Sequence, residues 1–482
     1  MRLKNLKVEI FAVGAAVFIL VYILMLHPVI GVADNGDFAR IMGSTGLQYM
    51  TTDYDERYFG FVNRQYKTGL AIPFGGGYFS TEIFIVSLAV LLSQSVWSSG
   101  IFDIRYLSFL YILIFLSSIY LIIRYHRQKL GQTGWLLAIL LIFIFADIGY
   151  ISYFNSLYGE AVSLVFLLLM AGAGIYLAVE DKPRLWGLMA FFAGALFFAG
   201  AKVQNSPLGL LAALLGLRIF KLRGDNVWRK VAIFSAAAVV FISFFSYITV
   251  SREIRVCNKY QTVFYGILKD SPNPAEDLEE LGLSPDLAVL AGTNYFLEEY
   301  PIDIRNAEFK NELYEKISHF KVAAFYLKHP DRLLKKLGIA AENAFKLKQG
   351  VGNYEKYPGI TYKQTANIFG FWSDFKMNVL PHSLLFVALF YIAYFSVLFY
   401  AYIRSKDIKS KLYVELLSII WLIGVIQLII PIIGDGEADL SKHLFLFNAG
   451  FDMMFIAGIV FLVRQGTVLA CRIYRRFYGK VI

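Results

Sequence analysis

Long apolar stretches with almost no charge inside them are the feature that most constrains this chain. A helix needs about 20 consecutive apolar residues to cross the ~30 Å hydrocarbon core of a bilayer. Only 17% of the 482 residues are charged, whereas a soluble domain averages about 25%. The stretches that we predict as spanning helices are 9–31, 104–123, 134–150, 160–179, 185–201, 206–220, 230–250, 383–403, 412–433 and 444–463. The sequence therefore predicts an all-α polytopic membrane protein with about ten transmembrane helices.

A further apolar run, residues 80–97, is ambiguous, and the distribution of Lys and Arg decides its placement. Basic residues concentrate in the cytoplasmic loops beside spanning helices. If 80–97 crossed the membrane, the basic loop 124–129 would lie outside and every later loop would be inverted. If it lies along the outer interface, every short basic segment is cytoplasmic. Those segments are the N-terminus, 124–129, 181–184, 221–230, 404–411 and 472–476. We therefore predict a multi-pass plasma-membrane protein with both termini in the cytoplasm.

This topology leaves two long segments outside the cell and divides the chain into three parts. Residues 1–250 form an N-terminal membrane module whose external loop, 32–103, contains interfacial helices. Residues 251–382 form an extracytoplasmic domain, in which apolar residues recur at helical spacing and Pro330 starts a new helix or kinks the first. Residues 383–482 form a C-terminal membrane module with a basic cytoplasmic tail.

The charge distribution argues against a nucleic-acid partner, and the cysteines argue against a disulfide within the chain and against a zinc site. The formal net charge is +10, but the positive residues lie mostly in short loops, where topology and anionic lipid headgroups explain them. We therefore predict membrane lipids as partners and no nucleic acid. The two cysteines, Cys257 and Cys471, fall on opposite sides of the membrane, so no disulfide within the chain is expected. No Cys or His spacing is typical of a zinc site.

Polar clusters, which played no part in setting the topology, all fall at the outer ends of predicted helices. Polar groups at the edge of hydrocarbon are costly and usually line a cavity or pair with one another. Four clusters on one face therefore predict one polar cavity that opens outward, at the extracytoplasmic side. The clusters are Asp34-Asn35-Gly36-Asp37, Asn155-Ser156-Leu157-Tyr158-Gly159-Glu160, Lys202-Val203-Gln204-Asn205-Ser206 and the segment 434–443.

Three carboxylates in these clusters are candidate catalytic groups. Asp34 and Asp37 flank a glycine and can approach each other in a turn, where crowding or burial would raise one pKa and leave a usable base. The alternative is an Asx turn that caps a helix starting near Phe38. Glu160 opens a predicted helix, so it is either functional or simply favoured by the helix dipole.

Four cationic or basic side chains are candidates for binding a phosphate. Lys202 and Lys442 have no partner within their own loops, and a lysine ammonium suits a phosphate, although snorkelling toward headgroups is the alternative. His443 could act as a base, donate a hydrogen bond to a phosphate, or simply form a polar end of the last helix. Arg255 begins the large external loop, where a lipid phosphate could be held.

The remaining polar residues are assigned to substrate or left open. Candidate substrate-binding side chains are Asn35, Tyr158, Asn205 and Asp439. The acidic run 434–439 could bind a divalent cation, but it matches no recognised metal motif, and we assign no metal ligands and no cofactor. Asp452, about two turns into the last helix, is either functional or paired with a neighbouring helix. Glu82 and the aromatic residues around 78–97 are typical of an interface belt.

The layout resembles the GT-C glycosyltransferases. The resemblance rests on a first helix, a long external loop that begins with an acidic motif, an interfacial helix, and Arg105 at the start of the next helix. Many members carry a Lys-Pro-Pro stretch before the interfacial helix, where this chain reads GGGYFSTEIF. More closely, DNGDF, NSLYGE, KHP, GNYEKYP, FWSDFK and SKHLFLFN are similar to segments of bacterial glycan-biosynthesis hexose transferases of the WsfD type.

The resemblance implies a membrane hexosyltransferase that uses a polyprenyl-phosphate-linked sugar. An aspartate of the first loop, here Asp34 or Asp37, would serve as the general base and the reaction would invert the anomeric carbon. The acceptor would be a cell-surface glycan or a lipid-linked glycan. Two alternatives remain open: a glycan polymerase or ligase, and a transporter or flippase of lipid-linked glycans. The long asymmetric external loops and the lack of an internal repeat argue against a transporter.

Overall fold

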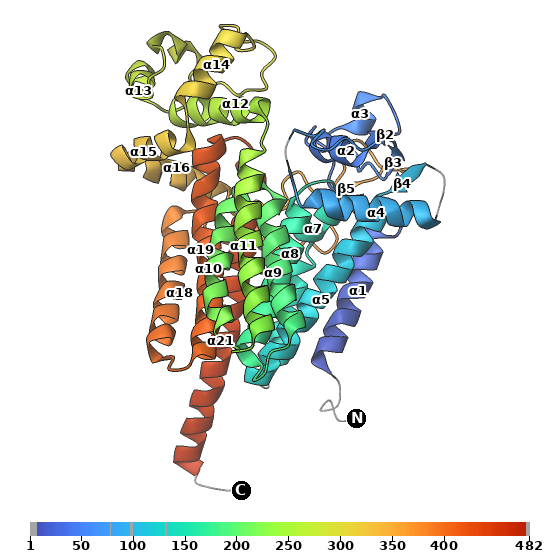
Figure 1. The fold of residues 1–482 in the computed structure, drawn as a ribbon, viewed down its shortest axis with the longest axis vertical. Helices are drawn as coiled ribbons and strands as arrows, with labels where there is room; N and C mark the ends of the chain where they lie inside the picture. Colours follow the sequence, from blue (N-terminus) through green and yellow to red (C-terminus); the bar gives the residue numbers. More distant parts are fainter. Residues whose placement is uncertain (1–6, 78, 97–99, 131–132, 479–482) are drawn as a thin grey trace.

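The chain folds into a bundle of long helices with two segments at one end, which we call the external segments after their predicted location (Figure 1). The computed structural model describes residues 7–77, 79–96, 100–130 and 133–478. The first helix of the bundle begins, and the last one ends, at the opposite end from the external segments (Figure 1). The bundle helices are α1 (Val8–Leu24), α5 (Arg105–Leu130), α6 (Gly134–Phe145), α8 (Glu160–Val179), α9 (Leu185–Ala201), α10 (Ser206–Phe220), α11 (Asn226–Ile248), α18 (Leu384–Arg404), α19 (Ile408–Asp435) and α21 (Phe445–Tyr478).

All ten predicted apolar runs contribute a helix to this bundle, and most of them are long enough to cross a membrane. Seven helices among the described residues meet the length and hydropathy expected of a span, and an eighth is formed if α6 and the bent segment after it count together. Helices α1 and α9 have 17 residues each, or about 25 Å. The membrane character is therefore confirmed, while ten as the number of spans stays a prediction.

Two predicted helices are shorter than expected. The run 9–31 ends as a helix at Leu24, because Pro28 cannot donate to a helical ladder and residues 30–31 instead form strand β1 (Ile30–Gly31). The run 134–150 breaks after Phe145, and the chain turns by 56° into α7 (Ile148–Ile151) and η3 (Ser152–Asn155). Asp147 starts the new direction, since its side chain caps α7 by accepting a hydrogen bond from the Gly149 amide at 2.9 Å.

The ambiguous run 80–97 forms α4 (Glu82–Val96), which lies across the outer end of the bundle rather than along it (Figure 1). This orientation fits the prediction of an interfacial helix. The start of the helix is tied to α9, because Thr81 donates from its hydroxyl to the Phe197 carbonyl at 2.7 Å and Ser80 donates to the Ala201 carbonyl at 2.8 Å. Tyr78 and Trp97, which were predicted to belong to an aromatic belt, lie outside the described residues.

The first external segment contains small strands that an all-α prediction does not include. Strands β2 (Leu47–Tyr49), β3 (Gln65–Thr68) and β4 (Ile101–Asp103) form an antiparallel sheet in the order β2-β3-β4. Helices α2 (Ala39–Thr45) and α3 (Tyr54–Arg57) belong to the same segment. The turn 75–77 packs so tightly on α2 that a Cβ at Gly76 would lie 1.5 Å from the Arg40 carbonyl oxygen. The glycines of GGGYFSTEIF therefore serve close backbone packing.

The second external segment is helical, as predicted, and is shared between two cores. A new helix does begin at Pro330. One hydrophobic core joins residues 256–345 to α18, α19 and α21, whereas residues 347–372 pack on the core of the N-terminal helices. β1 pairs with β5 (Asn353–Tyr354), so residues 353–354 are joined to the chain just after the first helix. The segment consists of α12 (Arg252–Tyr260), η5 (Gln261–Ile267), α13 (Pro274–Glu280), η6 (Pro285–Leu290), α14 (Ala307–Lys316), α15 (His319–Lys328), α16 (Pro330–Asn343), β5 and α17 (Phe371–Asn378).

Candidate functional site

The four predicted polar clusters meet at the outer end of the bundle and are joined in a closed ring by side-chain contacts. Each cluster contacts the next, although they come from segments as far apart as residues 34 and 443. The four links are Asn35 to Tyr158 at 2.9 Å, Glu160 to Lys202 at 2.6 Å, Gln204 to His443 at 3.2 Å and Lys442 to Asp37 at 2.7 Å. The structure therefore brings the four clusters together, while the cavity that opens outward stays a prediction, and we call these eight residues the polar ring.

Asp37 is the carboxylate of the polar ring that stays accessible. Its side chain is 30% exposed and is paired with Lys442 at 2.7 Å and with Arg40 at 3.0 Å. Burial alone would raise the pKa of Asp37. The positive charges of Lys442, Arg40 and Lys202 outweigh that effect and hold this pKa well below its ordinary value. Asp37 is therefore ionised at neutral pH, with cations around it.

Asp34 has a different environment and a structural role. It is fully buried. One of its carboxylate oxygens accepts hydrogen bonds from the backbone amides of Gly36 at 2.7 Å and Phe38 at 3.1 Å, and the other accepts one from the Tyr49 hydroxyl. Burial raises the pKa of Asp34 despite these bonds. Asp34 thus makes the turn-capping contacts that were the alternative prediction for this motif.

The turn is held from behind by an aromatic contact. Phe38 is fully buried, and its ring packs edge-on against the ring of Tyr158 with centroids 4.6 Å apart. The Tyr158 hydroxyl in turn donates to the side-chain oxygen Oδ1 of Asn35 and accepts a hydrogen bond from the backbone N–H of Asn35 at 3.0 Å. Asn35 and Tyr158, which were predicted to bind substrate, therefore orient the loop that presents Asp37.

Lys442 and Lys202 lie within the ring, each on a carboxylate from a different loop. The ammonium of Lys442 bonds Asp37 and lies 4.0 Å from the centroid of the Tyr158 ring. Burial would lower the pKa of Lys442, but the negative charges of Asp37 and Glu160 raise it overall. Lys202 bonds Glu160 at 2.6 Å, and both lysine side chains are 19% exposed. Snorkelling toward headgroups is therefore not what positions these two lysines.

His443 belongs to a second part of the ring, next to the end of α19. Its Nε2 lies 3.0 Å from an Asp435 oxygen and its Nδ1 lies 3.2 Å from Gln204 Oε1. Gln204 also donates to Gln427 at 2.9 Å. With an aspartate on one nitrogen and an amide on the other, the His443 ring is fixed in orientation and is 24% exposed.

Besides Asp34, three predicted site residues are not brought into the ring. Arg255, predicted to bind phosphate, donates to the carbonyls of Val250 at 3.1 Å, Tyr247 at 3.0 Å and Ile248 at 2.9 Å, so its guanidinium satisfies the C-terminal end of α11. Asn205 is fully buried and donates to Ser163 at 2.8 Å and to the Phe198 carbonyl at 3.0 Å. Asp439 is exposed and occupies a left-handed backbone conformation with φ of 43°. These bonds engage both Arg255 and Asn205 within the protein, and direct ligand contact by either residue stays a prediction.

Sequence reasoning missed Glu82 as part of this region. The residue is fully buried, and neither of its carboxylate oxygens has a hydrogen-bond partner among the described residues. Burial raises the pKa of Glu82 well above its ordinary value, and the nearby charge of Glu160 adds to this while that of Lys202 opposes it. Its place in the apolar run 80–97 suggested an interface belt, whereas a charged residue inside such a run is itself a signal of function.

The acidic run 434–439 uses two of its carboxylates for ion pairs. Glu437 contacts Lys336 and Lys269, each at 2.6 Å, and Asp435 contacts His443. Within the ranges that the structure describes, no group of three or more His, Cys, Asp or Glu side chains is placed to hold a metal ion. Asp452 follows the alternative prediction of pairing, since it bonds Lys376 at 3.0 Å inside the bundle.

Comparison with known proteins gives a family match over almost the whole chain. A family model described as the YfdI N-terminal transmembrane domain matches residues 1–476. The uncharacterized protein YfdI of Escherichia coli (strain K12) is 25% identical to this chain over 389 residues, which are 79% of this chain and 82% of that protein. Both the polar ring and the two external segments lie within the matched residues.

Proposed function

We propose that this chain, which belongs to the family of the YfdI N-terminal transmembrane domain, is a membrane glycosyltransferase of the GT-C type. It would transfer a hexose from a polyprenyl-phosphate-linked donor to a cell-surface glycan or a lipid-linked acceptor at the extracytoplasmic face of the plasma membrane. The observation that carries the proposal is the polar ring, in which an accessible carboxylate, Asp37, and two lysines meet at one end of a membrane bundle.

In this mechanism Asp37 is the general base. It accepts the proton of the acceptor hydroxyl while that oxygen attacks the anomeric carbon of the donor sugar. The bond between that carbon and the phosphate oxygen breaks, and the lipid phosphate leaves with the electron pair. One displacement without a covalent intermediate inverts the anomeric configuration, by the logic that applies to inverting glycosidases.

Lys442 and Lys202 would stabilise the departing phosphate. Lys442 has a second role, because it neutralises Asp37 as long as no donor is bound. A donor phosphate competes for the same ammonium. Donor binding would therefore draw Lys442 from Asp37 and leave the carboxylate a stronger base at the moment when the acceptor hydroxyl needs one.

The position of the ring supports a transferase over the flippase alternative. The linked polar residues lie together at one end of the bundle. Helix α8, which contributes Glu160, is the most buried of the candidate spans, since 89% of the residues in its apolar 18-residue stretch are buried. A chain that moves a lipid-linked glycan through the membrane would be expected to carry polar groups near the midplane. A polymerase or ligase would share the same chemistry and differ in its acceptor.

The test is the replacement of Asp37 by Asn in the purified full chain. Asn keeps the shape of the side chain and removes its basicity, so turnover with a polyprenyl-phosphate hexose should fall by ~10²–10⁴-fold. Binding of the donor lipid should largely persist, since the two lysines remain. Sugar transfer and release of polyprenyl phosphate would be measured together in detergent.

Two control variants sharpen this experiment. Asp181→Asn changes an exposed aspartate in the predicted cytoplasmic loop before α9 and should leave transfer unchanged. Asp34→Asn removes a buried turn cap, so it should lower the thermal unfolding temperature as well as the rate. Near-normal transfer by a folded Asp37→Asn chain would show that Asp37 is not the base.

A further inference from the structure

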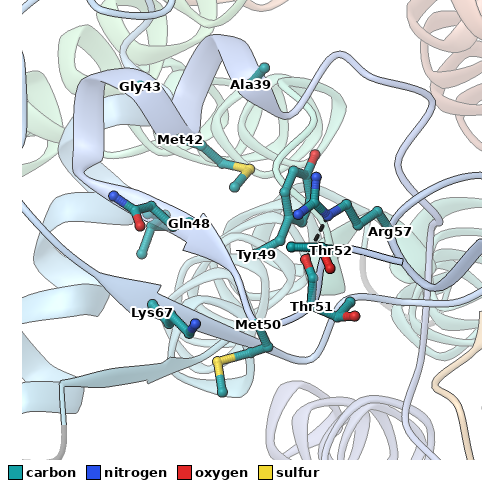
Figure 2. Close-up of a pocket in the computed structure, with 11 residues that line it drawn as sticks. Ala39, Met42, Gly43, Gln48, Tyr49, Met50, Thr51, Thr52, Arg57 and Lys67 are labelled. Atoms are coloured by element: carbon teal, nitrogen blue, oxygen red, sulfur yellow. Dashed lines mark hydrogen bonds between the residues drawn. The ribbon is translucent and has the colours of Figure 1, made fainter. Parts of the chain in front are cut away.

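A pocket lies in the first external segment (Figure 2), and none of the eight polar-ring residues lines it. Its volume is about 510 Å³, within the usual range for small-ligand sites. The lining comes from α2, from β2 and the residues after it, from α3 and from β3. The lining residues are Ala39, Met42, Gly43, Leu47, Gln48, Tyr49, Met50, Thr51, Thr52, Arg57 and Lys67.

The lining combines apolar side chains with polar and cationic ones. Met42, Leu47 and the ring of Tyr49 supply surface on which the C–H face of a sugar can pack, while amide and hydroxyl groups of other lining residues can bond sugar hydroxyls. Two cations, Arg57 and Lys67, line the pocket, and no carboxylate does. This balance favours a ligand that has both an apolar face and negative charge.

Arg57 is held ready for such a ligand. Its Nε donates to the Thr51 carbonyl at 2.6 Å, and its guanidinium lies 5.1 Å from the centroid of the Tyr49 ring. Among the residues that the structure describes, none accepts a hydrogen bond from the terminal nitrogens of Arg57 or from the ammonium of Lys67. A fixed guanidinium with free terminal N–H groups is suited to bind a carboxylate or a phosphate.

The pocket is physically connected to the candidate base. The Tyr49 hydroxyl donates to Asp34, whose carboxylate holds the turn that presents Asp37. Helix α2 begins two residues after Asp37, lines the pocket and carries Arg40, which pairs with Asp37 at 3.0 Å. The elements around the pocket lie beyond α4 on the side away from the bundle (Figure 1). A ligand therefore arrives from the aqueous side.

We infer that this pocket binds the acceptor and that the acceptor carries an anionic sugar residue, either a uronic acid or a sugar phosphate. The inference rests on the proposed transfer reaction. The acceptor would be held on α2 with its reactive hydroxyl toward Asp37, while the lipid-linked donor approaches the two lysines of the polar ring from the membrane side.

The experiment measures saccharide binding to the full chain in nanodiscs without any donor. Three short oligosaccharides would differ in one residue: glucuronic acid, glucose 6-phosphate or glucose. The two anionic probes should bind and the neutral one should bind much more weakly. Arg57→Gln and Lys67→Gln should each weaken anionic binding by about ten- to a hundred-fold, the loss typical of a charge-assisted hydrogen bond. The relative affinity of the two anionic probes distinguishes a uronic acid from a sugar phosphate.

Lys363→Gln is the matched control, because Lys363 is an exposed lysine of an external segment that does not line the pocket. It should bind all three probes like the unmodified chain. Equal affinity for neutral and anionic probes, unchanged binding by the Arg57 and Lys67 variants, or displacement of the saccharide by a short-chain anionic phospholipid would each overturn the inference. None of these results depends on Asp37, so a failure of the proposed transfer reaction is read separately from the Asp37→Asn assay.

Discussion

The two aspartates of the Asp34–Asp37 turn differ because backbone amides satisfy one of them and cations face the other. Asp34 accepts from Gly36 and Phe38 at the start of α2, where a buried carboxylate caps the chain. Asp37 points to Lys442 on another loop, 405 residues away in the sequence. In the proposed transfer reaction the base must reach the acceptor hydroxyl, and of these two aspartates the accessible Asp37 meets that requirement.

The ion pair predicts a specific pH dependence. The pKa of Asp37 lies below its ordinary value, so Asp37 stays ionised, and its stabilising contribution stays present, until the pH falls through that lowered pKa. The acidic limb of kcat/KM should therefore lie below the ordinary aspartate value of about 3.9. Among the charges that lower the pKa of Asp37, Lys442 has the largest effect. Lys442→Gln removes that charge, so the acidic limb should move to higher pH.

The measurement is the pH profile of sugar transfer by the two chains, each corrected for the fraction that remains folded. Lys363→Gln changes an exposed lysine that is not part of the polar ring, so this variant should keep the pH profile of the unmodified chain. The Lys442 variant should also transfer more slowly at every pH, because the leaving phosphate loses a cation. A limb that stays in place or moves to lower pH would contradict the coupling between Lys442 and Asp37.

At the scale of elements, a buried ion pair attaches the external helix α17 to α21. Lys376 and Asp452 have fully buried side chains and lie 3.0 Å apart. The Asp452 carboxylate also accepts from Trp372 Nε1 at 2.9 Å and from the Tyr150 hydroxyl. The Asp452 carboxylate therefore has one cation and two further hydrogen-bond donors. A buried charge is costly unless it is paired and hydrogen-bonded in this way.

Breaking this pair should destabilise the chain strongly. Lys376→Met leaves Asp452 buried without its cation, and loss of one partner from a buried pair costs about 3–5 kcal/mol. The double variant Lys376→Met/Asp452→Asn removes the charge but keeps an acceptor for Trp372, so it should recover much of the loss. Thermal unfolding of the purified chain in detergent gives the comparison. A single variant as stable as the parent, or a double variant worse than the single one, would contradict this role.

For the whole molecule, the external segments are not separate from the membrane helices. Residues 256–345 share a core with α18, α19 and α21, and residues 347–372 share one with the N-terminal helices. The predicted division at 251 and 383 therefore follows the topology rather than the packing. The loops of the polar ring are linked to one another by their own side-chain contacts.

Topology itself is tested by chemical labelling in intact cells. In a chain without Cys257 and Cys471, Glu279→Cys on α13 should react with a membrane-impermeant thiol reagent, and Lys406→Cys before α19 should not. Both positions are exposed, so access across the membrane is the only difference between them. Permeabilised cells should label both. Equal labelling in intact cells would exclude the predicted arrangement with both termini in the cytoplasm.

Local composition was enough to predict the helices and much of the candidate site. Apolar length identified all ten bundle helices, because the bilayer demands internal hydrogen bonding over about 20 residues wherever the chain crosses it. The distribution of Lys and Arg placed Asp37, Glu160, Lys202 and Lys442 at one end of the bundle, where the structure has them together. Apolar length and the distribution of Lys and Arg can be recognised in the sequence because each depends on a single segment and its position relative to the membrane surface.

Only the tertiary structure decided which side chains pair and which merely lie nearby. Lys202 finds Glu160 and Lys442 finds Asp37 because helix packing brings their loops together, and no periodicity in any one loop encodes that choice. The same packing buried Asn205 and gave it Ser163 as a partner. It also left Glu82 unpaired within the described residues. Burial and pairing depend on contacts between distant segments, so they appear only once the bundle has closed.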